Sequence, residues 1–153
     1  KGPVHASVVL ENLFQIAEKE VVFFSGSFNS DVTDKPNFIK ALKGFLSSGK
    51  LFLLFLESMP EKNQQSSALK EVLRLQDFPG KNIHIKIANN GLKQKISSLF
   101  RDKQLHHFAV SDSKAFRMET DAAEYTAICN FNDPKISTML RNVLMDYYSS
   151  VND

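Results

Sequence analysis

Two buried strand patterns, separated by a helix pattern, constrain the fold of this chain most strongly. Val21 to Phe24 is a run of β-branched and aromatic residues that ends in Ser-Gly-Ser, which is typical of a buried strand followed by a turn. Lys50 to Leu56 is a second apolar run. Between them, apolar residues recur at helical spacing from Pro36 to about Leu46, and proline is favoured in the first turn of a helix. This order predicts parallel strands that are connected through a helix.

The rest of the chain extends this alternation. We expect further helices over about residues 6–18, 69–75 and 92–100, and a last one after Asp133 and Pro134. Further strands are expected over about residues 83–87, 106–110, 115–118 and 125–129, and polar loops over residues 31–35 and 57–66. The pattern predicts a single domain over residues 1–153 of the α/β class. Its sheet should be mixed but mostly parallel, with helices on both faces.

Composition narrows the class of protein further. Hydrophobic residues make up 42% and charged residues 24% of the chain, which excludes a disordered or collagen-like protein. The single cysteine, Cys129, excludes a disulfide framework and favours a reducing, cytoplasmic compartment. The longest apolar run, Leu51 to Leu56, is far shorter than the roughly 20 residues of a membrane-spanning helix. The chain begins Lys-Gly-Pro rather than with methionine, so we expect either an excised fragment, whose flanking domains hold part of the function, or residues added during cloning.

Positive charge is concentrated in one segment, although the whole chain carries only +2. Residues 81–107 hold six cations and one acid, which gives this segment +5 and leaves −3 for the rest. Such a basic segment suits a nucleic acid, a phosphorylated ligand or an acidic partner; the alternative is a solvated surface with chance asymmetry. The ligand-binding candidates in it are Lys86, Lys93, Lys95, Arg101 and Lys103.

The turn after the first predicted strand is a second candidate for ligand binding. In an open α/β sheet, ligands bind at the carboxyl ends of the strands, which here are Ser25 to Asn29, Glu57 to Met59 and Ala88 to Asn90. Small residues such as Ser25, Ser27 and Asn29 can present backbone N–H groups to an anion, or they form an ordinary turn. Neither a GxxxxGK[ST] loop nor a GxGxxG loop is present, so no nucleotide cofactor is expected.

The histidines do not form a recognisable metal site. His106 and His107 are adjacent, so on a strand they would point to opposite faces. Nearby acids complete no ligand pattern, and we expect no metal. His107 is either a general acid–base or nucleophilic catalyst, because imidazole titrates near neutral pH, or a half-buried structural residue.

Arg117, Glu119 and Asn132 complete the list of candidate catalytic residues with His107. Arg117 and Glu119 are two apart on a predicted strand and therefore share a face. They form either a surface ion pair or a phosphate-binding pair in a cleft. Asn132 follows the last predicted strand, where it serves the site or helps to cap the final helix.

One stretch resembles a known family. Residues 105–119, Leu-His-His-Phe-Ala-Val-Ser-Asp-Ser-Lys-Ala-Phe-Arg-Met-Glu, together with Asn130 to Pro134 and the closing helix, resemble the phospholipase D superfamily. The order of elements fits one half of that bilobal fold over nearly the whole chain. The resemblance implies a homodimer, because the smallest members are about this length and build one site from two copies.

The catalytic pattern of that family, HxKxxxxD followed by a GSxN turn, is degenerate in this sequence. With Asp112 as the family aspartate, the lysine position is His107 and the histidine position is Leu105; the turn falls near Cys129 to Asn132. With His107 as the family histidine instead, the lysine and aspartate positions become Ala109 and Lys114. Gly26 to Asn29 spells GSxN, but it precedes the HxK-like region, which is the wrong order.

Three hypotheses about function follow. The first is a non-catalytic phospholipase D-like domain that binds a phosphate-containing ligand, a nucleic acid or a protein partner. The second is a divergent phosphodiesterase or nuclease that acts as a homodimer through His107, Arg117, Glu119 and Asn132. The third is a sensing domain of a larger regulator.

Overall fold

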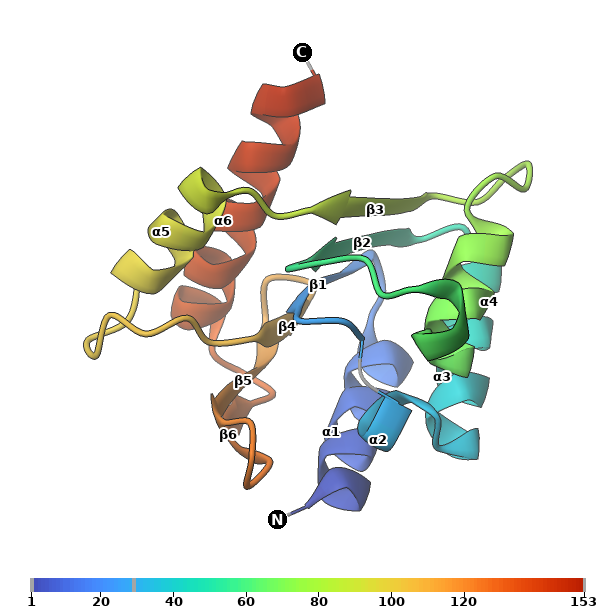
Figure 1. Cartoon of the computed structure of the whole chain (residues 1–153), viewed down its shortest axis with the longest axis horizontal. Coiled ribbons are helices and arrows are strands. Elements are labelled where there is room, and N and C mark those ends of the chain that lie inside the picture. The colour runs from blue at the N-terminus through green and yellow to red at the C-terminus, as the bar shows by residue number, and fades with distance from the viewer. Residues whose placement is uncertain (1, 29, 153) are drawn as a thin grey trace.

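A six-stranded mixed sheet forms the centre of the computed structural model, which describes residues 2–28 and 30–152 (Figure 1). The strand order is β3-β2-β1-β4-β5-β6. Strands β1, β2, β3 and β5 run in one direction, and β4 and β6 run in the other. The strands are β1 (Glu20–Ser25), β2 (Leu51–Leu56), β3 (Ile83–Ile87), β4 (Phe108–Ser111), β5 (Ala115–Asp121) and β6 (Thr126–Asn130).

Helices cover both faces of this sheet. One face is covered by α1 (Pro3–Ile16), α2 (Ser30–Thr33), α3 (Pro36–Ser47) and α4 (Ser67–Leu75). The other face is covered by α5 (Asn90–Ser98) and α6 (Pro134–Asn152). A short 3-10 helix, η1 (Lys62–Gln64), lies in the connection between β2 and α4. Of the helices in the described part of the chain, none combines the length and the apolar character needed to cross a membrane.

The alternation of side chains in the central strands explains the two apolar runs. Val21 and Phe23 of β1 face the core beneath α1 and α3, whereas Val22 and Phe24 face the core beneath α5 and α6. All four side chains are buried. A central strand with a helix layer on each side therefore reads as a continuous apolar run. The mixed α/β fold class with helices on both faces is confirmed.

The structure differs from the sequence-based prediction in a few segments. Residues 31–35, expected to be a polar loop, include the end of the short helix α2. The first helix begins at Pro3 rather than at about residue 6, with the proline in its first turn. The predicted strand at residues 106–110 begins only at Phe108, so the two histidines lie before the strand rather than on it. Tyr125 has a left-handed φ of 53°, which delays the start of β6 by one residue.

Asp112 joins the start of β1 to the end of β4 in the middle of the sheet. Its carboxylate accepts hydrogen bonds from the backbone N–H groups of Glu18, Lys19 and Glu20, at 2.7, 2.8 and 2.9 Å. These groups open β1, whereas Asp112 directly follows β4. The contact therefore fixes the register at which β1 and β4 pair.

Candidate functional site

His107 lies where the ends of three strands meet. It directly precedes β4, and its Nε2 atom lies 2.7 Å from Oε2 of Glu57, the residue that directly follows β2. Its Nδ1 atom lies 3.4 Å from Glu119 Oε1 on β5. Both ring nitrogens thus face a carboxylate, which is the arrangement that favours an imidazolium cation.

The electrostatics of this cluster favour ionised groups. Burial alone would lower the pKa of His107, but hydrogen bonding to Glu119 and Glu57, together with their negative charges, outweighs burial and raises it. Hydrogen bonding to His107 and the positive charges of His107 and Arg117 hold the pKa of Glu119 below its ordinary value, against the opposing effect of burial. His107 and Glu119 therefore stabilise each other in their charged forms.

Arg117 is the buried cation of the site. Its residue is only 7% exposed, and burial lowers its pKa despite the nearby charge of Glu119. The closest carboxylate contact runs from Nη1 to Glu119 Oε2 at 3.9 Å, and the guanidinium makes no hydrogen bond to any residue in the described ranges 2–28 and 30–152. A buried guanidinium with five N–H donors and no hydrogen-bond acceptor is expected to bind an anion.

His107, Arg117 and Glu119 line one pocket of about 220 Å³ at the carboxyl end of β1. Its lining also includes Ser25, Gly26, Ser27, Phe28 and Tyr125. A Cβ atom at Gly26 would lie 3.3 Å from the His107 ring and 3.5 Å from Glu57, so a larger residue there would crowd the cluster. A larger residue at this position would therefore require the His107 ring to shift by a few tenths of an ångström.

The structure brings together three of the four predicted catalytic residues. His107, Arg117 and Glu119 line the pocket, but Asn132 does not. The backbone N–H of Asp133 donates to Lys114 O, which lies in the turn between β4 and β5, at the opposite end of both strands from His107 and Glu119. Because β6 runs antiparallel to β5, the residues that follow β6 are carried away from the site.

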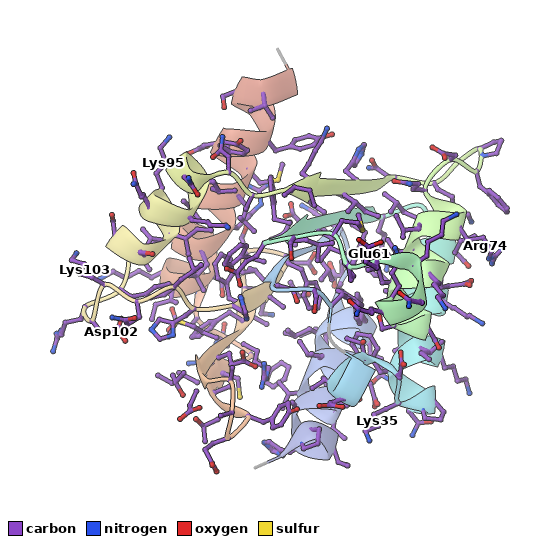
Figure 2. The ribbon with its side chains drawn as sticks, in the orientation of Figure 1. Lys35, Glu61, Arg74, Lys95, Asp102 and Lys103 are labelled. Carbon is purple, nitrogen blue, oxygen red and sulfur yellow. The ribbon has the colours of Figure 1, made fainter. Side chains whose placement is uncertain are left out.

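The predicted ligand-binding residues fall into two groups. Ser25 and Ser27 line the pocket, and Asn29 lies outside the described residues. The cations of the basic segment lie instead on β3, on α5 and in the loop after it: Lys95 and Arg101 are exposed, Lys86 lies 5.8 Å from the ring of Tyr148, and Lys93 and Lys103 line a shallow depression. Figure 2 shows Lys95 and Lys103 at the outer side of α5. The structure thus places this basic surface beside, rather than inside, the pocket.

Glu57 contacts His107 but is not among the candidate residues that the sequence predicted for the site. It directly follows β2, so the rule that ligands bind at the carboxyl ends of parallel strands already indicated its position. Its partner, His107, is 50 residues away in sequence, and no local pattern pairs them. Among the described residues, no group of three or more His, Cys, Asp or Glu side chains is placed to hold a metal ion.

Among the comparisons with known proteins, the comparison with solved structures identifies the fold. No family model and no curated protein matches the sequence. Among solved structures, the crystal structure of Nuc from Salmonella typhimurium, a phospholipase D family member, matches with a TM-score of 0.58. The match covers 93% of this chain and 86% of that chain at 15% sequence identity. The match shows that this chain shares the fold of that structure.

Proposed function

From the phospholipase D fold of this chain, we propose that it is a non-catalytic domain that binds a phosphate-bearing ligand in the pocket of Arg117. The observation that carries this proposal is the buried Arg117 guanidinium, which has no hydrogen-bond acceptor among the described residues. Planar guanidinium groups match phosphate geometry with paired N–H donors. A phosphate in the pocket would supply the acceptors that the protein itself does not.

The state of His107 argues against phosphohistidine chemistry. A nucleophilic imidazole needs one unprotonated nitrogen that is directed at phosphorus. Both nitrogens of His107 face carboxylates, and the raised pKa favours the doubly protonated ring. In the register anchored on Asp112, moreover, the histidine position of the family motif is Leu105. These features support binding of a phosphate without transfer of it to the protein.

The basic segment supports nucleic acid as the form of this ligand. Helix α5 begins at Asn90, just after the carboxyl end of β3, so it starts at the same edge of the sheet as the pocket. Its lysines and those of the following loop add exposed positive charge at that edge (Figure 2). A strand with one phosphate in the pocket would then pass its neighbouring phosphates over α5.

A binding experiment with two opposing variants tests the proposal. Fluorescence anisotropy with single-stranded and double-stranded oligonucleotides, at 50 mM and 200 mM salt, should show binding that weakens with salt. Arg117→Gln should weaken binding by roughly 10- to 150-fold, since one charge-assisted contact is worth about 1.5–3 kcal/mol. Glu119→Gln should strengthen it severalfold, because it removes an anion that competes for Arg117 and His107.

The matched control is Arg74→Gln, which removes an exposed cation on α4 that is paired with Glu71 at 2.6 Å. It should leave binding nearly unchanged, and circular dichroism should show that all three variants are folded. Absence of binding at low salt would reject nucleic acid as the ligand. Equal affinities of the wild type and the Arg117 variant would reject the pocket as the binding site.

The convergence of His107, Arg117 and Glu119 on one pocket favours a second candidate, a divergent phosphodiesterase that acts as a homodimer. In that case, His107 acts as a general acid through the proton that its carboxylate partners stabilise. Hydrolysis of bis(4-nitrophenyl) phosphate by the wild type and by His107→Ala separates the two functions. Hydrolysis that the substitution abolishes would support the enzyme, whereas equal rates would remove His107 from any mechanism.

A further inference from the structure

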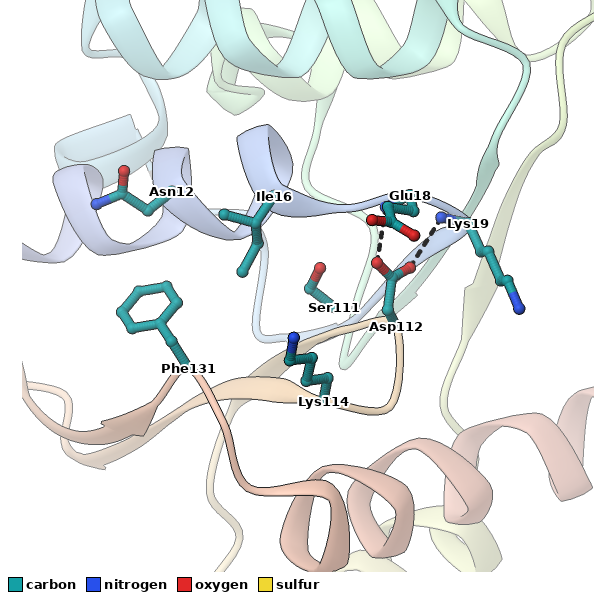
Figure 3. A pocket seen from close by; sticks show the side chains of 8 residues that line it. All are labelled: Asn12, Ile16, Glu18, Lys19, Ser111, Asp112, Lys114 and Phe131. Carbon is teal, nitrogen blue, oxygen red and sulfur yellow. Dashed lines mark hydrogen bonds between the residues drawn. The ribbon is translucent and has the colours of Figure 1, made fainter.

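A second and larger cavity lies at the end of the sheet opposite to the Arg117 pocket. It has a volume of about 590 Å³ and lies between α1, the turn that joins β4 and β5, and the segment after β6. Figure 3 shows Ser111 on its floor, with Ile16, Phe131 and Lys114 around it. Ser111 ends β4, whereas His107 precedes the start of that strand, so the two cavities share no lining residue.

Ser111 is the residue that marks this cavity as a binding site. It is 1% exposed, and its hydroxyl has no hydrogen-bond partner among the residues that the structure describes. A buried hydroxyl without a partner destabilises a folded protein by about 1–3 kcal/mol. Its cross-strand neighbour Ala115 is equally buried and carries no polar group, so alanine would fit this environment without that cost. An unpaired serine here is explained if a ligand completes its hydrogen bonding.

The walls around Ser111 combine apolar surface with positive charge. Ile16 and Phe131 are 45% and 38% exposed, so both offer apolar surface to a ligand in the cavity. The side chain of Lys114 extends toward the space between Phe131 and Ser111 (Figure 3) and forms no ion pair within the described residues.

The cavity is lined by two acids, Glu18 and Asp112, and by two lysines, Lys19 and Lys114, so its formal charges balance. The Asp112 carboxylate already accepts hydrogen bonds from three backbone N–H groups. Lys114 forms no ion pair within the described residues, so the cavity offers this cation, one buried hydroxyl and an apolar wall.

We propose that this cavity binds a small carboxylate with an apolar, arylalkyl body. The carboxylate lies against the Lys114 ammonium and accepts a hydrogen bond from the Ser111 hydroxyl. The apolar body lies between Phe131 and Ile16 and shields their exposed surface. The volume is within the range of about 300–1,000 Å³ that is typical of small-molecule sites. This site is separate from the phosphate-binding function proposed above.

The test uses 3-phenylpropionate as the probe, and the readout is the set of amide chemical shifts of the ¹⁵N-labelled 153-residue chain. We expect saturable shifts for residues around the cavity, at millimolar or lower concentration. The neutral isostere 3-phenylpropanamide should bind at least fivefold more weakly, because it cannot form the ion pair with Lys114. Arg117→Gln should leave these shifts and the affinity unchanged, since the other pocket plays no part.

Two variants distinguish a binding role of these residues from a structural one. Ser111→Ala should keep or raise the melting temperature, because it removes an unpaired buried hydroxyl, yet it should weaken the probe about fivefold. Lys114→Gln should weaken binding of the probe to the level of the amide, whereas Lys70→Gln, at an exposed lysine of α4 that does not line the cavity, should have no effect. Equal binding of acid and amide, shifts that map elsewhere, or full affinity in the Ser111 and Lys114 variants would overturn the proposal.

Discussion

At the scale of single residues, His107 is held by one carboxylate on each ring nitrogen. Because its pKa in the folded protein is raised above the ordinary 6.5, the stabilisation from this cluster is fully present below pH 6.5. It is lost as the pH rises through the folded-state pKa of His107. The pKa of Glu119 is lowered from 4.5, so its part is present above pH 4.5 and is lost only as the pH falls through the folded-state value.

Urea unfolding of the wild type and of His107→Gln measures this contribution directly. The difference in the free energy of unfolding should be largest between pH 5 and 6 and should shrink by pH 9. An NMR titration of His107 should give a midpoint above 6.5. A midpoint at or below that value would contradict the arrangement of the two carboxylates.

Asp112 gives a second prediction at this scale. Its carboxylate accepts three backbone hydrogen bonds, and its own φ of 55° is in the left-handed region that aspartate and asparagine tolerate. Asp112→Asn keeps this backbone preference but removes the charge and one acceptor. We expect the free energy of unfolding to fall by about 1.5–3 kcal/mol. Asp77→Asn, in the exposed turn after α4, is the control and should change stability by less than about 0.5 kcal/mol; equal effects would argue against a special role of Asp112.

The sequence predicted part of the site at residue level. Three candidate residues, His107, Arg117 and Glu119, line the same pocket. The strand pattern with period two correctly indicated that Arg117 and Glu119 share a face. Asn132 was placed by analogy with a motif, and the antiparallel course of β6 takes it to the other end of the sheet. The contact between Glu57 and His107 depends on tertiary structure alone, which no local pattern encodes.

At the scale of elements, helix α3 and the turn after it contain two glycines with opposite expected effects. Gly44 is exposed within the helix, and a Cβ atom there would meet nothing within 4 Å. Gly49 has a φ of +79°, and a Cβ atom there would lie 3.3 Å from Gly80 O. Gly44→Ala should therefore stabilise the protein by about 0.5–1 kcal/mol. Gly49→Ala should destabilise it by about 1–2 kcal/mol.

Thermal unfolding by circular dichroism checks this pair, and each variant serves as the control for the other. If the melting temperature moves in the same direction in both variants, the backbone conformation of Gly49 does not determine the change in stability of Gly49→Ala.

Elements were predicted more completely than the site. Apolar periodicity located the long helices and the central strands, because an element that is buried on one or both faces needs apolar residues at regular spacing. The short helix α2 contains no long apolar pattern, and residues 31–35 were therefore predicted as a loop. The start of β4 was predicted too early, because residues 106 and 107 resemble the beginning of a strand. In the structure, His106 Nε2 lies 2.8 Å from Asp102 Oδ2 in the loop before β4.

At the scale of the whole molecule, two cores lie on opposite faces of the same strands. Leu42 of α3 is fully buried in one core, and Leu140 of α6 is fully buried in the other. Either Leu→Ala substitution should lower the free energy of unfolding by about 2–5 kcal/mol. Since β1 and β2 contribute side chains to both cores, unfolding should remain a single transition in both variants.

Far-ultraviolet circular dichroism and tyrosine fluorescence report on backbone and side-chain packing, so their unfolding curves should coincide. Separate transitions, or a variant that loses only one set of signals, would show that the two faces unfold independently.

The pairing of β1 with β4 has a consequence for synthesis of the chain on the ribosome. Strand β1 pairs with its first neighbour, β2, which follows after the helices α2 and α3, but its other neighbour begins only at Phe108. At a translation rate of about 5–20 residues per second, that edge of β1 stays open for several seconds after β1 has been made. During this interval, the unpaired edge of β1 is available to chaperones or to another nascent chain. The order of translation therefore exposes a strand that lies in the middle of the finished sheet.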